Sequence, residues 1–142
     1  MPIKPIFKIV EEAKQDIENL TCEDLEQELE GDEKPLLVDI REIQEYVDLG
    51  TIPDAVHAPR GMLEFWADPS SPYFRGNFTE DKRIVLFCAA GGRSALAVKA
   101  LKEMGFSNVA HLEPGFNGWA KSKKPIQETK TRSRWMRKLR GL

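Results

Sequence analysis

The sequence predicts an α/β domain built on a largely parallel sheet, and two observations favour that class. Short continuous apolar runs, typical of strands buried on both faces, alternate with longer amphipathic stretches that are typical of helices. The clearest runs are LLVDI at 36–40 and IVLFC at 84–88. A chain of 142 residues, 41% of them hydrophobic, is long enough for one domain with a full core and too short for two ordinary ones. We therefore expect one folded unit with extensions.

Two helices are predicted before the first buried strand. Residues 1–20 place Ile9, Ala13 and Ile17 at helical spacing, which favours an amphipathic helix ahead of the domain. Thr21 then caps a second helix, because a threonine followed three positions later by an acidic residue matches the capping-box pattern.

The later elements follow from similar patterns. Two amphipathic stretches, 41–50 and 94–105, each end at a glycine, the residue that most often ends a helix. A third strand, VAHLE, is predicted at 109–113. Residues 59–82 open as a helix and then break at two prolines, which predicts an aromatic-rich loop over one end of the sheet.

Composition narrows the location and the chemistry. No apolar run approaches the roughly 18 residues that a membrane span requires, and charged residues interrupt the N-terminal segment before an export signal can form. We therefore expect a cytoplasmic protein. Cys22 and Cys88 are far apart and outside any CxxC motif, so neither a disulfide framework nor a zinc site is indicated, and no metal or cofactor is expected.

Charge is distributed unevenly along the chain. Residues 1–120 hold 12 Lys and Arg side chains against 22 Asp and Glu, whereas residues 121–142 hold 9 against 1. Within the tail, the segment 129–142 places apolar side chains on one helical face and basic side chains on the other. We favour a solvated tail, or one docked on the acidic body, over contact with an acidic partner or a membrane surface. No specific nucleic-acid binding is expected.

Cys88 ends the apolar run at 84–88 and precedes a short loop and a helix. In a parallel α/β sheet the carboxyl ends of the strands open toward the ligand, and the following helix points its N-terminus at the same place. An ordinary thiol, with a pKa of about 8.5, is mostly protonated at neutral pH, but a helix N-terminus and loop amides stabilise the thiolate. The position predicts a nucleophile, with a buried structural cysteine as the alternative.

The loop after Cys88 has the composition of an anion-binding turn. Gly91 and Gly92 lack Cβ atoms and can adopt the positive φ values that turn successive N–H groups inward. Arg93 adds a permanent positive charge that can grip an anionic substrate or stabilise the thiolate. We predict that the substrate-binding loop consists of Ala89, Ala90, Gly91, Gly92, Arg93 and Ser94.

Three motifs resemble those of the rhodanese-like family of sulfurtransferases, over roughly residues 18–122. The active-site loop of that family often reads C-x-x-G-x-R/T-S, which residues 88–94 match. An earlier family motif, often DVREPEEYxxGHIPGA, is echoed by DIREIQEYVDLGTIPDA at 39–55, and a later one, often LxGGxxxW, by LEPGFNGW at 112–119. Three motifs in the same order make the resemblance specific.

The resemblance implies a three-layer sandwich with a central, mainly parallel five-stranded sheet and helices on both faces. It divides the chain into an N-terminal helical extension (1–17), a rhodanese-like domain (18–122) and a basic C-terminal tail (123–142). It also implies sulfur transfer. The Cys88 thiolate would take a sulfane sulfur from a small donor such as thiosulfate, become a persulfide, and pass the sulfur to cyanide, a thiol or a protein acceptor.

Two other functions stay open. One is a non-catalytic protein-binding or regulatory module, because Ala89 and Ala90 stand where thiosulfate-using members of the family often place Arg or Lys. The other is a phosphatase or an arsenate reductase, which loop length disfavours. Enzymes of that kind with a related fold place five residues between the cysteine and the arginine, whereas four separate Cys88 from Arg93.

Residues after the first buried strand are expected to support the site. Asp39 is expected to anchor loop backbone near the active site, and Arg41 to form a structural ion pair with Glu45, one helical turn further on. His57 and His111 lie in or beside apolar strands, where satisfied core histidines are more common than catalytic bases.

Overall fold

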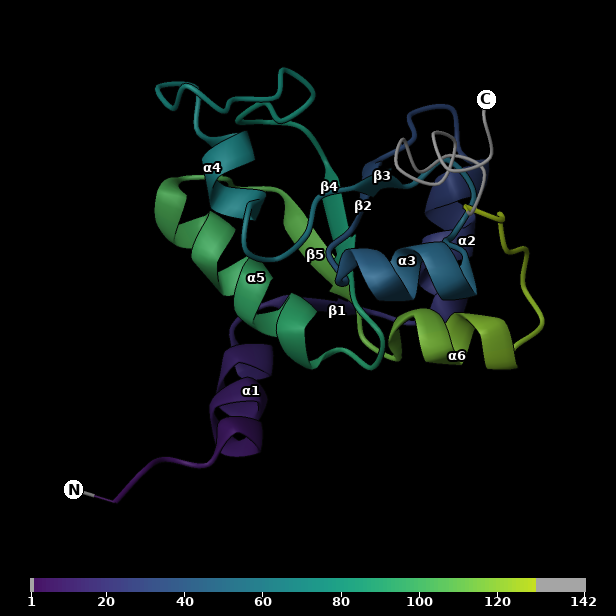
Figure 1. The fold of residues 1–142 in the computed structure, drawn as a ribbon, viewed down its shortest axis with the longest axis horizontal. Coiled ribbons are helices and arrows are strands. Elements are labelled where there is room, and N and C mark those ends of the chain that lie inside the picture. The colour runs from purple at the N-terminus through teal and green to yellow at the C-terminus, as the bar shows by residue number, and fades with distance from the viewer. Residues whose placement is uncertain (1, 130–142) are drawn as a thin grey trace.

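The centre of the fold is a five-stranded parallel sheet with the strand order β1-β5-β4-β2-β3 (Figure 1). The structure is a computed structural model and describes residues 2–129. Its strands are β1 (Glu18–Leu20), β2 (Leu36–Asp39), β3 (Val56–His57), β4 (Ile84–Phe87) and β5 (Val109–Leu112). Every side chain of β4 is buried, as an unbroken apolar run predicts. The predicted α/β class with a central parallel sheet is confirmed.

Helices cover both faces of the sheet and give it three layers. They are α1 (Ile6–Gln15), α2 (Cys22–Glu30), α3 (Ile43–Leu49), α4 (Leu63–Ala67), α5 (Gly92–Met104) and α6 (Gly115–Lys121). Because successive strand residues point to opposite faces, Leu86 packs with residues of α4 and α5, whereas Phe87 packs with residues of α2 and α6. α1 lies outside α5, where Val10 and Ala13 pack on Ala95.

Helix boundaries follow local signals that the sequence carries. Thr21 Oγ1 accepts a hydrogen bond from the Asp24 N–H at 3.0 Å, and the Asp24 carboxylate accepts one from the Thr21 N–H at 3.0 Å. This is the capping box predicted for α2. Gly50 and Gly105 end α3 and α5 with φ of 80° and 115°, a backbone conformation that costs little in a glycine.

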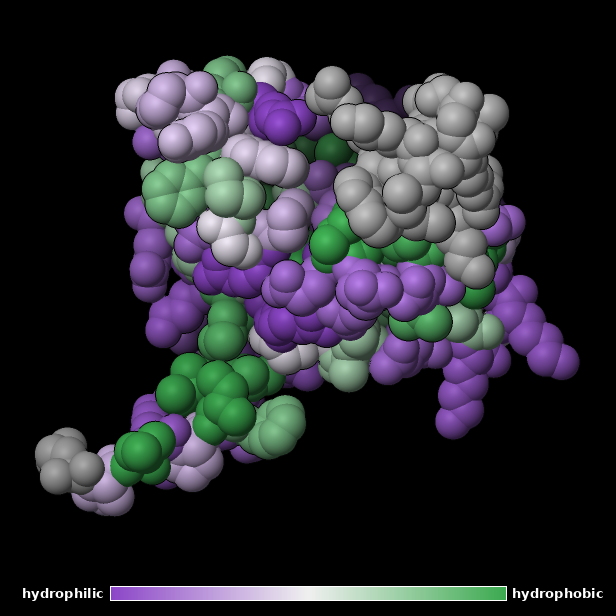
Figure 2. Space-filling view, in the orientation of Figure 1, coloured by the Kyte–Doolittle hydropathy of each residue, from purple (hydrophilic) through white to green (hydrophobic). Residues whose placement is uncertain are grey.

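The N-terminal segment differs in part from its prediction. The pattern predicts a helix over 1–20, but α1 ends at Gln15 and residues 18–20 form β1, an edge strand paired with β5. β1 reads Glu-Asn-Leu and has no apolar run, so pairing with β5 rather than local preference makes it a strand. Ile6 and Phe7 are exposed, and Figure 2 shows the hydrophobic surface of α1 projecting from the body.

The aromatic loop after α4 lies at the amino ends of the strands. Residues 68–83 lead from α4 into β4 (Figure 1). Phe74 and Phe78 of this loop line a pocket together with Phe106, which follows the C-terminal end of α5. Cys88 lies at the other end of α5, shortly before its first residue. The loop therefore covers the end of the sheet that faces away from Cys88.

After α6 the described part of the chain folds back onto the body. Thr51 and Gln127 exchange backbone hydrogen bonds of 2.8 and 2.9 Å, and Lys124 forms an ion pair with Glu26 at 3.0 Å. The amphipathic segment predicted at 129–142 lies, apart from its first residue, outside the described residues. No helix in the described part of the chain is long and apolar enough to cross a membrane.

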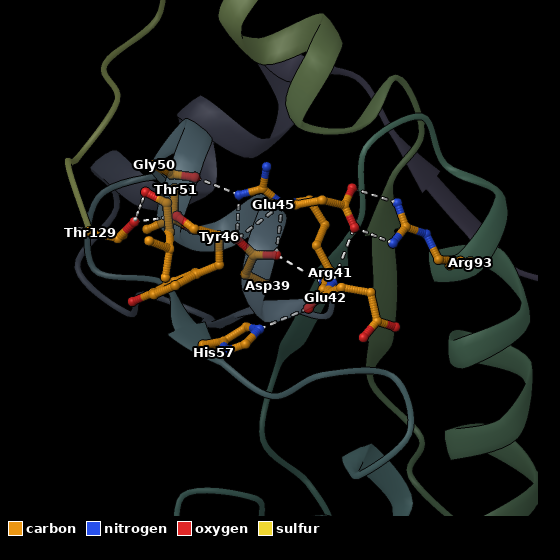
Figure 3. Close-up of polar contacts among 11 residues, drawn as sticks. Asp39, Arg41, Glu42, Glu45, Tyr46, Gly50, Thr51, His57, Arg93 and Thr129 are labelled. Carbon is orange, nitrogen blue, oxygen red and sulfur yellow. Dashed lines mark hydrogen bonds and ion pairs between the residues drawn. The ribbon is translucent and has the colours of Figure 1, made fainter. Parts of the chain in front are cut away.

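A fully buried ion pair joins the end of β2 to the turn after α3. Asp39 accepts hydrogen bonds from Arg41 Nη2 at 2.7 Å and Nε at 3.0 Å, and from Thr51 Oγ1 at 2.7 Å (Figure 3). The Arg41 guanidinium also lies 4.1 Å from the centre of the Phe116 ring. The prediction that Arg41 pairs with Glu45 is wrong, because Arg41 turns inward to Asp39 while Glu45 lies at the partly exposed side of α3.

We predict that Asp39→Ala lowers the free energy of unfolding by about 3–5 kcal/mol, because it leaves the Arg41 guanidinium buried without its carboxylate. Chemical denaturation measures this loss. The double variant Asp39→Leu with Arg41→Met is the control and should lose much less, since it removes both charges. A loss below about 1 kcal/mol in Asp39→Ala would contradict the structural role of the pair.

Candidate active site

The loop after Cys88 is held by direct backbone contacts with the start of α6. The carbonyls of Cys88 and Ala89 accept hydrogen bonds of 2.8 and 3.0 Å from N–H groups in the first turn of α6. Gly91 has a φ of 92°, and a Cβ on it would lie 2.1 Å from the Glu113 carbonyl oxygen. A Cβ on Gly115, whose φ is 68°, would lie 2.4 Å from the Ala89 carbonyl oxygen. Both close approaches therefore require glycine.

Cys88 Sγ lies inside this loop, and the residue is only 1% exposed. The N–H groups of Gly91 and Ser94 point at Sγ, with N···S distances of 3.2 and 3.4 Å. Gly91 is the N-cap of α5 and Ser94 lies in its first turn, where the helix dipole favours negative charge. Ser94 Oγ lies 3.5 Å from Sγ. The two N–H groups can stabilise an anionic sulfur.

The predicted loop residues take different positions around Cys88. Gly91 has the expected positive φ, whereas Gly92 does not, because it is the first residue of α5 and takes helical backbone angles. α5 thus begins two residues before the predicted start at Ser94. Ala89 is half-buried and Ala90 is exposed, and their methyl groups bring no charge to the loop.

Arg93 is paired with a carboxylate. Its Nη1 and Nη2 bind Glu45 Oε1 and Oε2 at 2.7 and 3.0 Å, which links α5 to α3 (Figure 3). The Arg93 guanidinium lowers the pKa of Glu45, and the Glu45 carboxylate in turn raises the pKa of Arg93. Arg93 remains charged, but the Glu45 carboxylate offsets much of the electric field that the Arg93 guanidinium exerts at Cys88. No local pattern indicates this pair, because 48 residues separate its members.

A hydrogen-bonded chain leads from Ser94 to the edge of the sheet. Ser94 Oγ lies 2.7 Å from His111 Nδ1, and His111 Nε2 lies 2.7 Å from Asn19 Oδ1. His111 is fully buried, and its burial, followed by the positive charge of Lys14, lowers its pKa to about 4. The ring is therefore neutral at physiological pH. The sequence indicates a satisfied core histidine but not its partners. Packing of α5 on β5 brings Ser94 to the ring, and pairing of β1 with β5 brings Asn19.

The fold and the loop together define a class of protein: a parallel α/β domain that holds a buried cysteine between the end of a strand and the first turn of a helix. The family model for the rhodanese-like domain matches residues 21–122, and the chain belongs to that family. A protein of Allochromatium vinosum named sulfurtransferase is 32% identical over 110 residues, which cover 78% of this chain and 94% of that relative. The chain spans only 51% of another relative, YrkF of Bacillus subtilis, at 32% identity.

Solved structures share the architecture. RPA3614 from Rhodopseudomonas palustris, a protein of unknown function described as a possible tyrosine phosphatase, is 43% identical with a TM-score of 0.80, over 89% of this chain and 99% of that one. A homodimeric polysulfide-sulfur transferase from Wolinella succinogenes is 28% identical with a TM-score of 0.69, over 85% of each chain. A thiosulfate sulfurtransferase from Pseudomonas aeruginosa, 23% identical with a TM-score of 0.70 over 87% of this chain and 22% of that one, has the same fold.

We predict that Glu45→Gln makes the loop more attractive to anions, because it frees the charge of Arg93. In a Cys22→Ala background, the rate of Cys88 alkylation by anionic iodoacetate, divided by the rate with neutral iodoacetamide, should rise about threefold at low salt, as expected for a partly exposed ion pair. Arg93→Gln should lower this ratio.

The control for this change is Glu28→Gln, which removes a carboxylate paired with Arg83 and should leave the ratio unchanged, because Arg83 lies just before β4, at the end of the sheet away from Cys88. An unchanged ratio in Glu45→Gln would mean that Arg93 does not act on anions at the loop. Measuring at high salt adds a second check, since screening should shrink the effect.

We predict that His111 makes stability fall in mild acid. Its pKa is about 4 when folded and about 6.5 in an unfolded chain, so between these values the unfolded state binds the extra proton. The free energy of unfolding should therefore decrease as pH falls from about 6.5 to about 4, by about 3 kcal/mol in total from this group. Denaturation at several pH values measures the slope, and the slope should be shallower in His111→Phe. Equal slopes would contradict the assignment.

Proposed function

We propose that this protein is a sulfurtransferase that carries a sulfane sulfur on Cys88 as a persulfide. The observation that carries the proposal is the pair of N–H groups, from Gly91 and Ser94, directed at Cys88 Sγ at the start of a helix. Membership of the rhodanese-like family and similarity to a protein named sulfurtransferase support it.

The proposed reaction has two displacements. The Cys88 thiolate attacks the outer sulfur of a donor such as thiosulfate. A bond forms between Sγ and that sulfur, and the donor's sulfur–sulfur bond breaks as sulfite leaves with the electron pair. An acceptor, either cyanide or a thiolate, then attacks the outer sulfur, and the bond to Sγ breaks with its electron pair returning to Cys88. Loop N–H groups stabilise the anion formed at each stage.

The charge of the loop bears on which molecules donate and accept the sulfur. Ala89 and Ala90 provide no charge, and Arg93 is engaged by Glu45, so a highly charged donor gains little attraction from these side chains. A donor of low charge, or a protein acceptor whose own surface contributes binding, suits such a loop. We place this reaction in the cytoplasm, as the sequence predicts.

A second candidate is phosphate chemistry, favoured by the 43% identity to a protein described as a possible tyrosine phosphatase. Two features oppose it. Only four residues separate Cys88 from Arg93, which leaves less room for a tetrahedral oxyanion. Arg93 is also bound to Glu45, whereas a phosphate dianion needs the guanidinium for itself. A non-catalytic binding module is the third outcome that the experiment below separates.

We predict that incubation with thiosulfate adds one sulfur atom to Cys88, that added cyanide then releases thiocyanate, and that Cys88→Ser abolishes both. Intact-protein mass spectrometry measures the adduct, and a colorimetric assay measures thiocyanate. Polysulfide serves as a second donor, because the loop offers little charge to thiosulfate.

Cys22→Ala is the matched control, since Cys22 is the other thiol of the chain and its burial raises its pKa. It should keep sulfur loading. Hydrolysis of para-nitrophenyl phosphate without sulfur loading would favour the phosphatase. The absence of both activities would favour the binding module. Full sulfur transfer by Cys88→Ser would refute the mechanism.

A further inference from the structure

Behind Cys88 lies a buried hydrogen-bonded chain that the two displacements above do not use. It runs from Cys88 Sγ to Ser94 Oγ at 3.5 Å, on to His111 Nδ1 at 2.7 Å, and from His111 Nε2 to Asn19 Oδ1 at 2.7 Å. Its members come from the β4 loop, α5, β5 and β1. Ser94 and His111 are both fully buried, so water does not compete for the bond between them.

Asn19 determines which ring nitrogen of His111 carries the proton. The amide nitrogen of Asn19 donates to the carbonyls of Lys14 and Ile17, at 2.9 and 3.1 Å. Its oxygen is therefore the atom that faces His111. An amide oxygen can only accept, so Nε2 of His111 carries the hydrogen and Nδ1 of the neutral ring is an acceptor.

This tautomer determines the direction in which the Ser94 hydroxyl donates its hydrogen bond. Because Nδ1 has no hydrogen, Ser94 donates its single hydroxyl hydrogen to His111. Ser94 Oγ then presents lone pairs to Cys88. Toward a thiol these lone pairs accept the S–H, but toward a thiolate they face a negative charge. A rotation of the hydroxyl toward sulfur would leave a buried acceptor on His111 without a partner.

We propose that His111, oriented by Asn19, is a positioning residue that keeps Ser94 as a hydrogen-bond acceptor toward Cys88 and so favours the persulfide over the free thiolate. The inference rests on the proposed sulfurtransferase function. In the thiolate the charge resides on Sγ, against the Ser94 lone pairs. In the persulfide Sγ is a neutral divalent sulfur, and the charge resides on the outer sulfur, one bond further from Ser94.

The charged groups near the hydrogen-bonded chain are compatible with this positioning role of His111. Arg93 acts on Cys88 from α5 and is paired with Glu45 of α3. Lys14 of α1 acts on His111 and lies 4.0 Å from the Glu113 carboxylate. Each of these cations has a carboxylate partner, and the positive charge of Lys14 further disfavours a protonated imidazole.

The test is the pH profile of Cys88 alkylation by iodoacetamide in a Cys22→Ala background. In His111→Phe the Ser94 hydroxyl loses its acceptor and can donate to the thiolate, so the midpoint of the profile should fall by about one pH unit. Ser94→Ala should not raise the midpoint, because the wild-type hydroxyl donates to His111. A midpoint that does not fall in His111→Phe, or that rises in Ser94→Ala, would overturn the proposal.

Two further measurements keep the test decisive. Nitrogen-15 NMR of the wild-type His111 ring should show a protonated Nε2 and an unprotonated Nδ1 near neutral pH, and the opposite tautomer would overturn the proposal even if His111→Phe does not fold. In thiosulfate–sulfite mixtures at a pH where Cys88 is ionised, His111→Phe should hold about tenfold less persulfide than wild type. A wild-type protein with the expected tautomer and pH profile that never loads sulfur would refute the proposed function instead.

Discussion

The feature on which the site depends is the backbone contact between the Cys88 loop and the start of α6. It brings two peptide segments together so closely that glycine is required on each side, at Gly91 and Gly115. Gly91 donates its N–H to Cys88 at this contact, and its positive φ turns the chain into α5, whose first turn contributes the N–H of Ser94. A side chain at either glycine would separate the segments, so the orientation of both amide donors follows from this one contact.

Two arginines near the site differ in environment and so in effect. Arg41 is fully buried with Asp39, where loss of one partner would leave a desolvated charge, so the pair specifies structure. Arg93 and Glu45 are both partly exposed, so water and salt weaken their attraction and the pair can open for modest free energy. α3 follows the first pair and carries the carboxylate of the second. The segment from Asp39 to Glu45 therefore anchors the fold and also supplies the carboxylate that offsets the positive charge of Arg93 near Cys88.

Local sequence patterns correctly predicted the features that depend on interactions between residues close in the sequence. The capping box of Thr21, the helix ends at Gly50 and Gly105, and the buried runs of β2, β4 and β5 depend on neighbours within a few residues. The partners of the site could not be predicted in this way. Glu45 meets Arg93 across 48 residues and Asn19 meets His111 across 92, and such contacts exist only after the sheet has formed. β1 was missed for the same reason, because its pairing partner makes it a strand.

The distribution of charge around Cys88 bears on how the site selects a substrate. Arg93 interacts with Cys88 and Lys14 interacts with His111, and each of these two cations lies beside a carboxylate. What remains directed at sulfur is a small set of N–H dipoles, which act over short distances and depend on where a charge resides. Under the proposed function, such a site would discriminate between anions by the position of their charge more than by its size. The proposed persulfide, whose charge lies one bond further from Ser94 than that of the thiolate, is an anion that this geometry would distinguish.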